Sequence, residues 1–258
     1  MAAERTRSDG RASDTLRDVT IETRVQRFPE GSVLYRAGGT TVLVSASIDD
    51  GVRDFLRGSG KGWVTAEYAM HPRANRFRQP RDGRRGGGID GRVQEIQRLV
   101  GRALRAAVIP SALGERTITI DCDVLDADGG TRTASITGGF VALALALDRL
   151  RQAGTLSRPP LRSAVAAVSA GLVAQRVLLD LCYEEDRDAA VDLNVVATPT
   201  GNIVEVQGTA EDAPVPRAAF DQLVEVALGG IATLGRAQKD ALAAAGVDLG
   251  RLFAPNPM

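Results

Sequence analysis

The sequence predicts an α+β fold made of two pseudo-symmetric halves, each a hairpin-plus-helix unit. Short β-rich runs punctuated by glycine precede a helix at 134–150, and a second series of β-rich runs precedes a helix at about 217–245. No residue-level repeat is legible, so the symmetry is one of element order. We expect one domain over 1–258, with approximate halves at 10–155 and 156–246 and an irregular tail at 247–258.

The first half begins with a hairpin. Residues 31–48 form two β-rich runs joined at Ala37-Gly38-Gly39, a turn signal. Residues 50–90 lose apolar periodicity and are rich in Gly, Pro and Arg, which predicts a long functional or disordered loop. Apolar residues then recur at helical spacing from Gln94 to Val108, and Pro110 is expected to close that helix.

A strand, a glycine turn and a helix follow in that order. The strand is predicted at 117–125, the turn at 128–133 and the helix at 134–150. In the second half the β-rich runs lie at 163–174, 176–183, 190–198 and 202–208.

Composition excludes several classes of protein. The charged start has no apolar leader core, and no run approaches the roughly 18 apolar residues that span a bilayer, so we expect a cytoplasmic protein with no membrane contact. Cys122 and Cys182 stand in apolar runs and lack metal-ligand spacing, which favours buried thiols in a reducing compartment. His71 has no partner for a nucleophilic triad, and no nucleotide phosphate loop or HExxH motif occurs.

Charge is unevenly distributed along this neutral chain. Residues 1–110 carry 20 Lys and Arg against 13 Asp and Glu, a net +7, and the rest carries 12 against 19, a net −7. Part of the excess is an arginine-rich loop whose prolines and glycine prevent a helix. Such a loop suits phosphodiester contacts, although a solvated loop with no partner has the same composition. Its arginines are Arg73, Arg76, Arg78, Arg81, Arg84 and Arg85.

Two further clusters could carry chemistry. In Gly129-Gly130-Thr131-Arg132-Thr133 the glycines permit close backbone approach and Arg132 offers a fork that fits phosphate, but a plain strand-to-helix turn needs similar residues. Acidic residues gather from Asp180 to Asp192, and strand alternation sets Asp192 and Asn194 opposite their apolar neighbours. Paired carboxylates there could hold Mg²⁺, and the wet face of a sheet is the simpler alternative.

Ordered motifs from about residue 10 to about 243 resemble the ribonuclease PH family. The most specific is DADGGTRTASITG at 126–138, and others are KGWVTAEYAM at 61–70, GRVQEIQRLVGRALRAA at 91–107 and VEVQGTAE at 204–211. The resemblance implies a fold like ribosomal protein S5 domain 2 and a homohexameric ring built as a trimer of dimers. It also implies a phosphate-dependent 3′→5′ exoribonuclease that trims tRNA precursors and other RNA 3′ ends, releases nucleoside diphosphates and can run in reverse as a nucleotidyltransferase.

The resemblance also assigns roles to residues of this chain. Inorganic phosphate would be held by Arg92, Gly130, Thr131 and Arg132. Asp186 and Asp192 match an acidic pair implicated in catalysis and Mg²⁺ binding. Arg73, Arg78 and Arg81 align with loop arginines that grip the acceptor stem of tRNA.

The chain departs from the family pattern in three places. Val93 stands where Thr is usual, Arg17-Asp18-Val19 replaces ArgProVal, and the arginine loop has an unusual Gly86-Gly87-Gly88. The alternative function is a catalytically silent RNA-binding subunit of an exosome-like ring. Retention of the proposed phosphate and acidic residues favours the enzyme.

Overall fold

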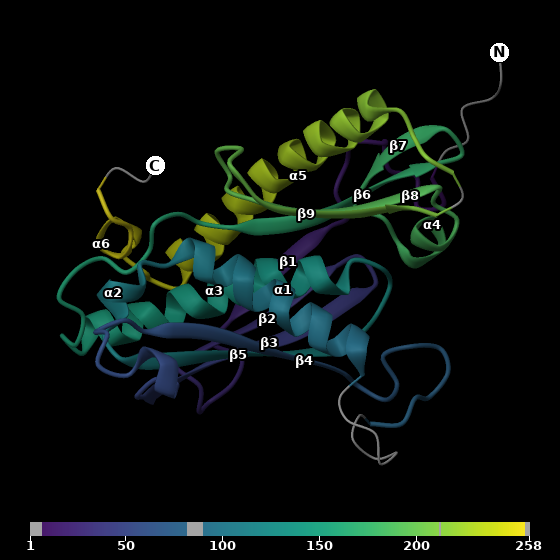
Figure 1. Ribbon diagram of the computed structural model, residues 1–258. Coiled ribbons are helices and arrows are strands. Elements are labelled where there is room, and N and C mark those ends of the chain that lie inside the picture. Colours follow the sequence, from purple (N-terminus) through teal and green to yellow (C-terminus); the bar gives the residue numbers. More distant parts are fainter. Residues whose placement is uncertain (1–6, 82–89, 212, 256–258) are drawn as a thin grey trace.

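The computed structural model describes residues 7–81, 90–211 and 213–255. They form two sheets with helices between and above them (Figure 1). From one side to the other, the layers are the first sheet, helices α1 (Gly91–Ala107) and α3 (Thr131–Gln152), the second sheet, and helix α5 (Arg217–Ala244). The α+β fold class is therefore confirmed.

The first sheet has the strand order β1-β2-β3-β5-β4. Its strands are β1 (Val19–Thr23), β2 (Gly31–Ala37), β3 (Thr40–Asp50), β4 (Trp63–Met70) and β5 (Arg116–Asp126). The expected hairpin is β2–β3, in antiparallel register from Gly31↔Ala46 to Ala37↔Thr40. Strand β4 is parallel to β5, which places the end of β4 beside the end of β5.

The second sheet has the order β7-β6-β8-β9, all antiparallel. Its strands are β6 (Ala166–Val173), β7 (Arg176–Leu179), β8 (Val191–Ala197) and β9 (Ile203–Ala210). Short helices complete the described chain: η1 (Asp54–Leu56), α2 (Pro110–Leu113), α4 (Tyr183–Arg187) and α6 (Leu249–Leu252).

Helix α3 occupies the centre of the protein. Every residue from Thr133 to Asp148 is buried, because one side of the helix packs on β2 and β3 while the other packs on β6 and α5. Gly31 of β2 permits this approach, since a Cβ there would lie 2.0 Å from the carbonyl oxygen of Ala142. The apolar side chains of α3 belong to the first apolar core, which they form with the first sheet and α1, while a second apolar core lies between the second sheet and α5.

Several expectations about local structure are wrong. The loop expected at 50–90 contains η1 and strand β4, and β4 forms because it pairs with β5, which is distant in sequence. The strand expected at 176–183 stops at Leu179, and helix α4 follows. Helix α1 begins before Gln94, at Gly91, because the Asp90 side chain accepts a hydrogen bond from the Arg92 N–H at 2.7 Å.

Two other boundaries differ from expectation. Helix α1 ends at Ala107, and Pro110 starts α2 instead of closing α1. The tail expected to be irregular contains α6, whose Leu252 is fully buried. Strand β1 had no counterpart among the expected elements.

Two helices in the described residues have the length and composition of a membrane span, which corrects the expectation that no segment does. Mean hydropathy reaches 1.3 in α3 and 1.2 in α5 over an 18-residue window. The window of α3 is 89% buried inside the protein, as in a core helix, whereas that of α5 is only 28% buried. Helix α5 therefore keeps apolar surface that the described residues do not cover.

Candidate active site

The glycine turn between β5 and α3 leads directly into the first turn of a long helix. Gly129 and Gly130 have φ of 74° and 65°, and Gly130 caps α3 without a side-chain hydrogen bond to the first turn. The backbone N–H groups at the start of the long helix, together with its dipole, favour a negative ligand. The predicted residues Gly130, Thr131 and Arg132 all lie at this helix start.

Gly129 also brings a distant segment to the turn. A Cβ on Gly129 would lie 2.5 Å from the carbonyl oxygen of Leu181, so only glycine permits this contact. The neighbouring Asp128 carboxylate accepts a hydrogen bond from the backbone N–H of Tyr183 at 3.1 Å. The start of α4 is thereby fixed beside the start of α3.

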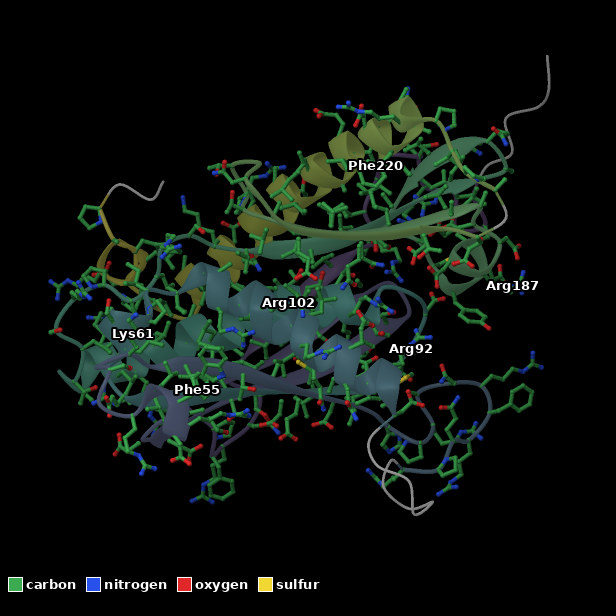
Figure 2. All side chains as sticks on the ribbon, in the orientation of Figure 1. Phe55, Lys61, Arg92, Arg102, Arg187 and Phe220 are labelled. Atoms are coloured by element: carbon green, nitrogen blue, oxygen red, sulfur yellow. The ribbon has the colours of Figure 1, made fainter. Side chains whose placement is uncertain are left out.

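The two predicted phosphate arginines come from different helices, Arg132 from the first turn of α3 itself and Arg92 from α1. Arg92 lies in the first turn of α1, at the end of the molecule where α4 also lies (Figure 2). Among the described residues, Arg132 makes only long contacts, 3.7 Å to a carboxylate oxygen of Glu95 and 3.5 Å to the amide oxygen of Gln207. Its guanidinium therefore has donors left for a phosphate.

Tyr68 connects β4 to this cluster. Its hydroxyl lies 2.9 Å from the Thr131 hydroxyl. Burial raises the pKa of Tyr68, while the Thr131 hydrogen bond and the charges of Arg92 and Arg132 act in the opposite direction. Tyr68 thus remains a neutral phenol that orients Thr131.

The acidic pair faces the two arginines. Burial, and secondly the charge of Asp186, raise the pKa of Asp192 to about 6, with Arg132 opposing the shift. Desolvation also raises the pKa of Asp186, against the charges of Arg132 and Arg92. Asp186 therefore lies within electrostatic range of Arg92, Arg132 and Asp192, and these four residues come from four separate elements.

One oxygen of Asp192 lacks a partner. Its Oδ2 accepts a hydrogen bond from the Asn194 side chain at 3.3 Å, but its Oδ1 is buried with no hydrogen bond in the described part of the chain. An unpaired carboxylate oxygen beside a second carboxylate fits a hard cation or a proton. The described residues contain no cluster of three or more His, Cys, Asp or Glu side chains for a closed metal site.

The loop arginines stand apart from this cluster. Arg73, Arg78 and Arg81 are exposed on the segment after β4, which is tied to the end of β5 by the His71 N–H donating to Val124 at 2.8 Å. The segment lies near the start of α1 (Figure 1). Arg84, Arg85 and Gly86-Gly87-Gly88 lie outside the described residues.

The departure at Val93 has a structural explanation. The Val93 side chain packs against the first apolar core, so the residue contributes to the anchoring of α1.

Tyr68, Asp128 and Tyr183 were not among the predicted site residues. The contacts of Tyr68 and Asp128 are made across strands and turns far apart in sequence. The sequence does mark Tyr183 as a candidate, because it is an aromatic residue directly before an acidic run.

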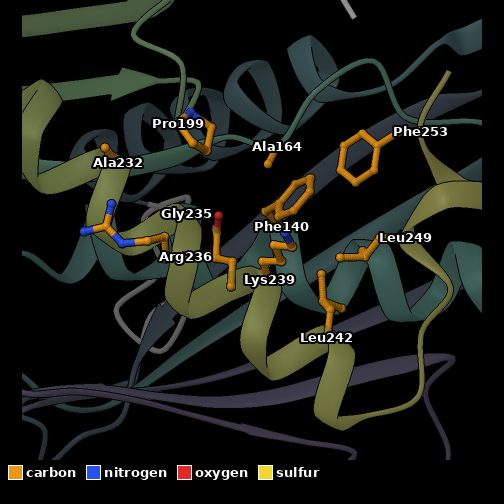
Figure 3. A pocket seen from close by; sticks show the side chains of 11 residues that line it. Phe140, Ala164, Pro199, Ala232, Gly235, Arg236, Lys239, Leu242, Leu249 and Phe253 are labelled. Atoms are coloured by element: carbon orange, nitrogen blue, oxygen red, sulfur yellow. The ribbon is translucent and has the colours of Figure 1, made fainter. Parts of the chain in front are cut away.

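A separate cavity of about 430 Å³ lies between α3, α5 and the C-terminal segment (Figure 3). Its walls are mainly apolar, with Phe140, Leu242 and Phe253 among them, and Arg236 and Lys239 also line it. None of the predicted site residues contributes to this cavity.

Comparison with known proteins identifies the family. Residues 15–147 match the model of the 3′ exoribonuclease family, domain 1, and residues 163–230 match that of domain 2. The chain is 56% identical over 238 residues to ribonuclease PH of Mycobacterium ulcerans, covering 92% of each chain. It is 55% identical over 238 residues to ribonuclease PH of Nocardia farcinica, again covering 92% of each.

Solved structures share the fold at low sequence identity. Rice (Oryza sativa) Rrp46 superposes with a TM-score of 0.74 and 17% identity, over 92% of this chain and 100% of the other. A chain of the Archaeoglobus fulgidus exosome with RNA bound to the active site superposes with a TM-score of 0.73 and 24% identity, over 90% and 92%. On the sequence relatives and the matched domains, the chain belongs to the ribonuclease PH family of phosphate-dependent 3′→5′ exoribonucleases.

Proposed function

We propose that the enzyme trims 3′ extensions of tRNA precursors, with the site at the start of α3 holding the attacking phosphate and Asp186 and Asp192 holding Mg²⁺. The observation that carries this proposal is that Arg132, at the start of α3, acts on both Asp186 and Asp192, and that Asp192 has a buried oxygen without a hydrogen-bond partner among the described residues. The charge of Arg92 also reaches Asp186. The two arginines would offset the charge of a phosphate brought beside an RNA phosphodiester.

The reaction is that of the phosphate-dependent exoribonuclease family to which the chain belongs. An oxygen of inorganic phosphate attacks the phosphorus that links the last nucleotide to the 3′ oxygen of the nucleotide before it. The new P–O bond gives a nucleoside diphosphate, and the broken P–O bond leaves a 3′ hydroxyl on the shortened RNA. The reverse direction adds a nucleotide and releases phosphate.

The residues divide this work. Arg132 can bind two phosphate oxygens through its fork, and Thr131, oriented by Tyr68, can donate a further hydrogen bond. Asp186 or Asp192, whichever carboxylate keeps its proton beside the cation, would help to protonate the departing 3′ oxygen. Asp186 and Asp192 would hold Mg²⁺, whose positive charge would stabilise the negative charge that develops during the transfer.

RNA binding and assembly extend the proposal. Arg73, Arg78 and Arg81 would contact the acceptor stem through its phosphates. Several copies would form a hexameric ring, a trimer of dimers, in the cytoplasm. Support for assembly comes from the exposed apolar surface of α5 and from the fold shared with a chain of the Archaeoglobus fulgidus exosome.

The test is release of nucleoside diphosphates from a 3′-extended tRNA with Mg²⁺, with and without inorganic phosphate. We expect release to require phosphate and to fall at least 100-fold in Arg132→Ala, because one charged donor to a transferring group contributes about 3 kcal/mol. Arg217→Ala, an exposed arginine at the start of α5, is the matched control. Release of monophosphates without added phosphate would contradict the proposal, and tRNA binding without turnover would indicate the silent ring subunit.

A further inference from the structure

Tyr183 is an exposed aromatic residue at the edge of the active site. It is the first residue of α4, and 57% of its surface is exposed. Its neighbours Leu181 and Cys182 are buried. An exposed tyrosine beside buried residues leaves a large ring surface in contact with water.

Two contacts fix Tyr183 relative to the phosphate residues. Its backbone N–H donates to the Asp128 carboxylate at 3.1 Å, and Gly129 approaches so closely that a Cβ there would lie 3.0 Å from the Tyr183 nitrogen. Asp128 and Gly129 directly precede Gly130, which caps α3. The position of Tyr183 is therefore set by the turn that would hold the attacking phosphate.

The same short helix carries Asp186. Residues three apart on a helix lie on the same side, so Tyr183 and Asp186 are neighbours along one face of α4. The charges of Arg92 and Arg132 reach Asp186. Tyr183 thus borders the place where the scissile phosphate would lie.

We infer that the Tyr183 ring is a stacking platform for a base at the 3′ end of the RNA. The proposed reaction needs the terminal nucleotide held with its phosphorus between the arginines and Asp192, and phosphate contacts alone do not fix the base. Proteins hold unpaired bases by stacking them on exposed aromatic rings, and stacking accepts any base. An enzyme that removes successive nucleotides requires that tolerance. The inference rests on the function proposed above.

The test compares Tyr183→Ala with Tyr183→Phe, which keeps the ring and removes the hydroxyl. In Tyr183→Ala we expect the KM for a single-stranded RNA to rise about tenfold, equivalent to about 1.4 kcal/mol, with the KM for phosphate changed less than twofold. Tyr183→Phe should behave as the wild type. Phe55→Ala is the control, because Phe55 is 65% exposed and lies far from Arg92 (Figure 2).

A second measurement does not depend on turnover. RNA with 2-aminopurine as its 3′-terminal base should lose fluorescence on binding the wild type and Tyr183→Phe without phosphate, and should keep more of it with Tyr183→Ala. Equal quenching by all three proteins, or an RNA KM in Tyr183→Ala within twofold of wild type, would overturn the inference. Quenching that depends on Tyr183 in a protein that releases no diphosphates would support the stacking role and reject the proposed reaction.

Discussion

Arg17 holds Asp180 through both carboxylate oxygens, at 2.7 and 3.1 Å, with both side chains buried. The same guanidinium donates to the carbonyl oxygen of Asp128 at 2.5 Å. Arg17 thus joins the N-terminal segment, the glycine turn before α3 and the residue that follows β7. The departure from the family pattern at Asp18 leaves this arginine in place.

Arg17→Met should therefore destabilise the fold and weaken phosphate binding together. Removing one partner of a buried ion pair costs about 3–5 kcal/mol, because the remaining charge stays buried. Urea unfolding measures the loss of stability, and the KM for phosphate, expected to rise, measures the displacement of the turn. The double variant Arg17→Met with Asp180→Leu should recover part of the stability, and no recovery would contradict this account.

Asp192→Asn should abolish turnover and stabilise the protein at pH 8. The pKa of Asp192 is raised to about 6 in the folded protein from an ordinary value of 3.8. The folded state therefore binds this proton more tightly than the unfolded state, and its contribution to stability is present below pH 4 and lost as the pH rises through 6. The ionised carboxylate then costs up to about 3 kcal/mol, which asparagine avoids.

The measurement is the free energy of unfolding of both proteins at pH 5, 6 and 8 without divalent metal. The advantage of Asp192→Asn should be largest at pH 8 and should shrink as the pH falls. A variant no more stable than wild type at pH 8 would show that the desolvation of Asp192 is not the cause.

Mg²⁺ should reverse the difference in stability between Asp192→Asn and the wild type at pH 8. A cation at Asp186 and Asp192 relieves the repulsion that raises the pKa of Asp192, so it should stabilise the wild type by about 1–3 kcal/mol when well above its Kd. The midpoint of thermal unfolding with and without Mg²⁺ measures the effect. Asp192→Asn should respond much less, and an equal response would place the metal elsewhere.

Arg132→Lys should lose most of the phosphate affinity although it keeps the charge. A lysine ammonium cannot make the two parallel hydrogen bonds of a guanidinium. We expect the KM for phosphate to rise at least tenfold while the KM for RNA changes little. Arg158→Lys, at an exposed position in the connection before β6, is the control. An unchanged phosphate KM would mean that Arg132 contributes only charge.

Replacing Arg73, Arg78 and Arg81 by alanine should weaken tRNA binding and reduce its dependence on salt. Each lost phosphate contact lowers the slope of log K against log salt by about 0.9, so the triple variant should lose about 2–3 in slope. Titration of tRNA at several salt concentrations measures this. Weaker binding with an unchanged slope would rule out direct phosphate contacts.

The parts of the fold that follow from the sequence are those with strong local signals. The hairpin at 31–48 and the helices α3 and α5 were predicted because their glycine turn and apolar periodicity lie within the segments themselves. Strand β4 was missed because it is stabilised by pairing with β5, which lies more than forty residues later in the sequence. Helix α4 was missed because a five-residue helix is too short to show an apolar periodicity.

For the site, residue types and motifs were enough to select candidates but not to place them. The nearness of Asp186 and Asp192 to Arg132 depends on the packing of α4 against the turn at Gly129, which no local pattern shows. The raised pKa of Asp192 likewise depends on burial. The roles of the selected residues stay predictions until the variants above are measured.

The central position of α3 also bears on motion. Helix α3 is buried along most of its length between two sheets, so its hydrogen bonds should break only when both halves of the protein unfold. The amide protons from Ala134 to Asp148 should therefore exchange with solvent at the rate of global unfolding. Because the proposed phosphate site lies at the end of that helix, its backbone donors are held in place before phosphate arrives. Phosphate binding should then require little rearrangement of the backbone at the start of α3.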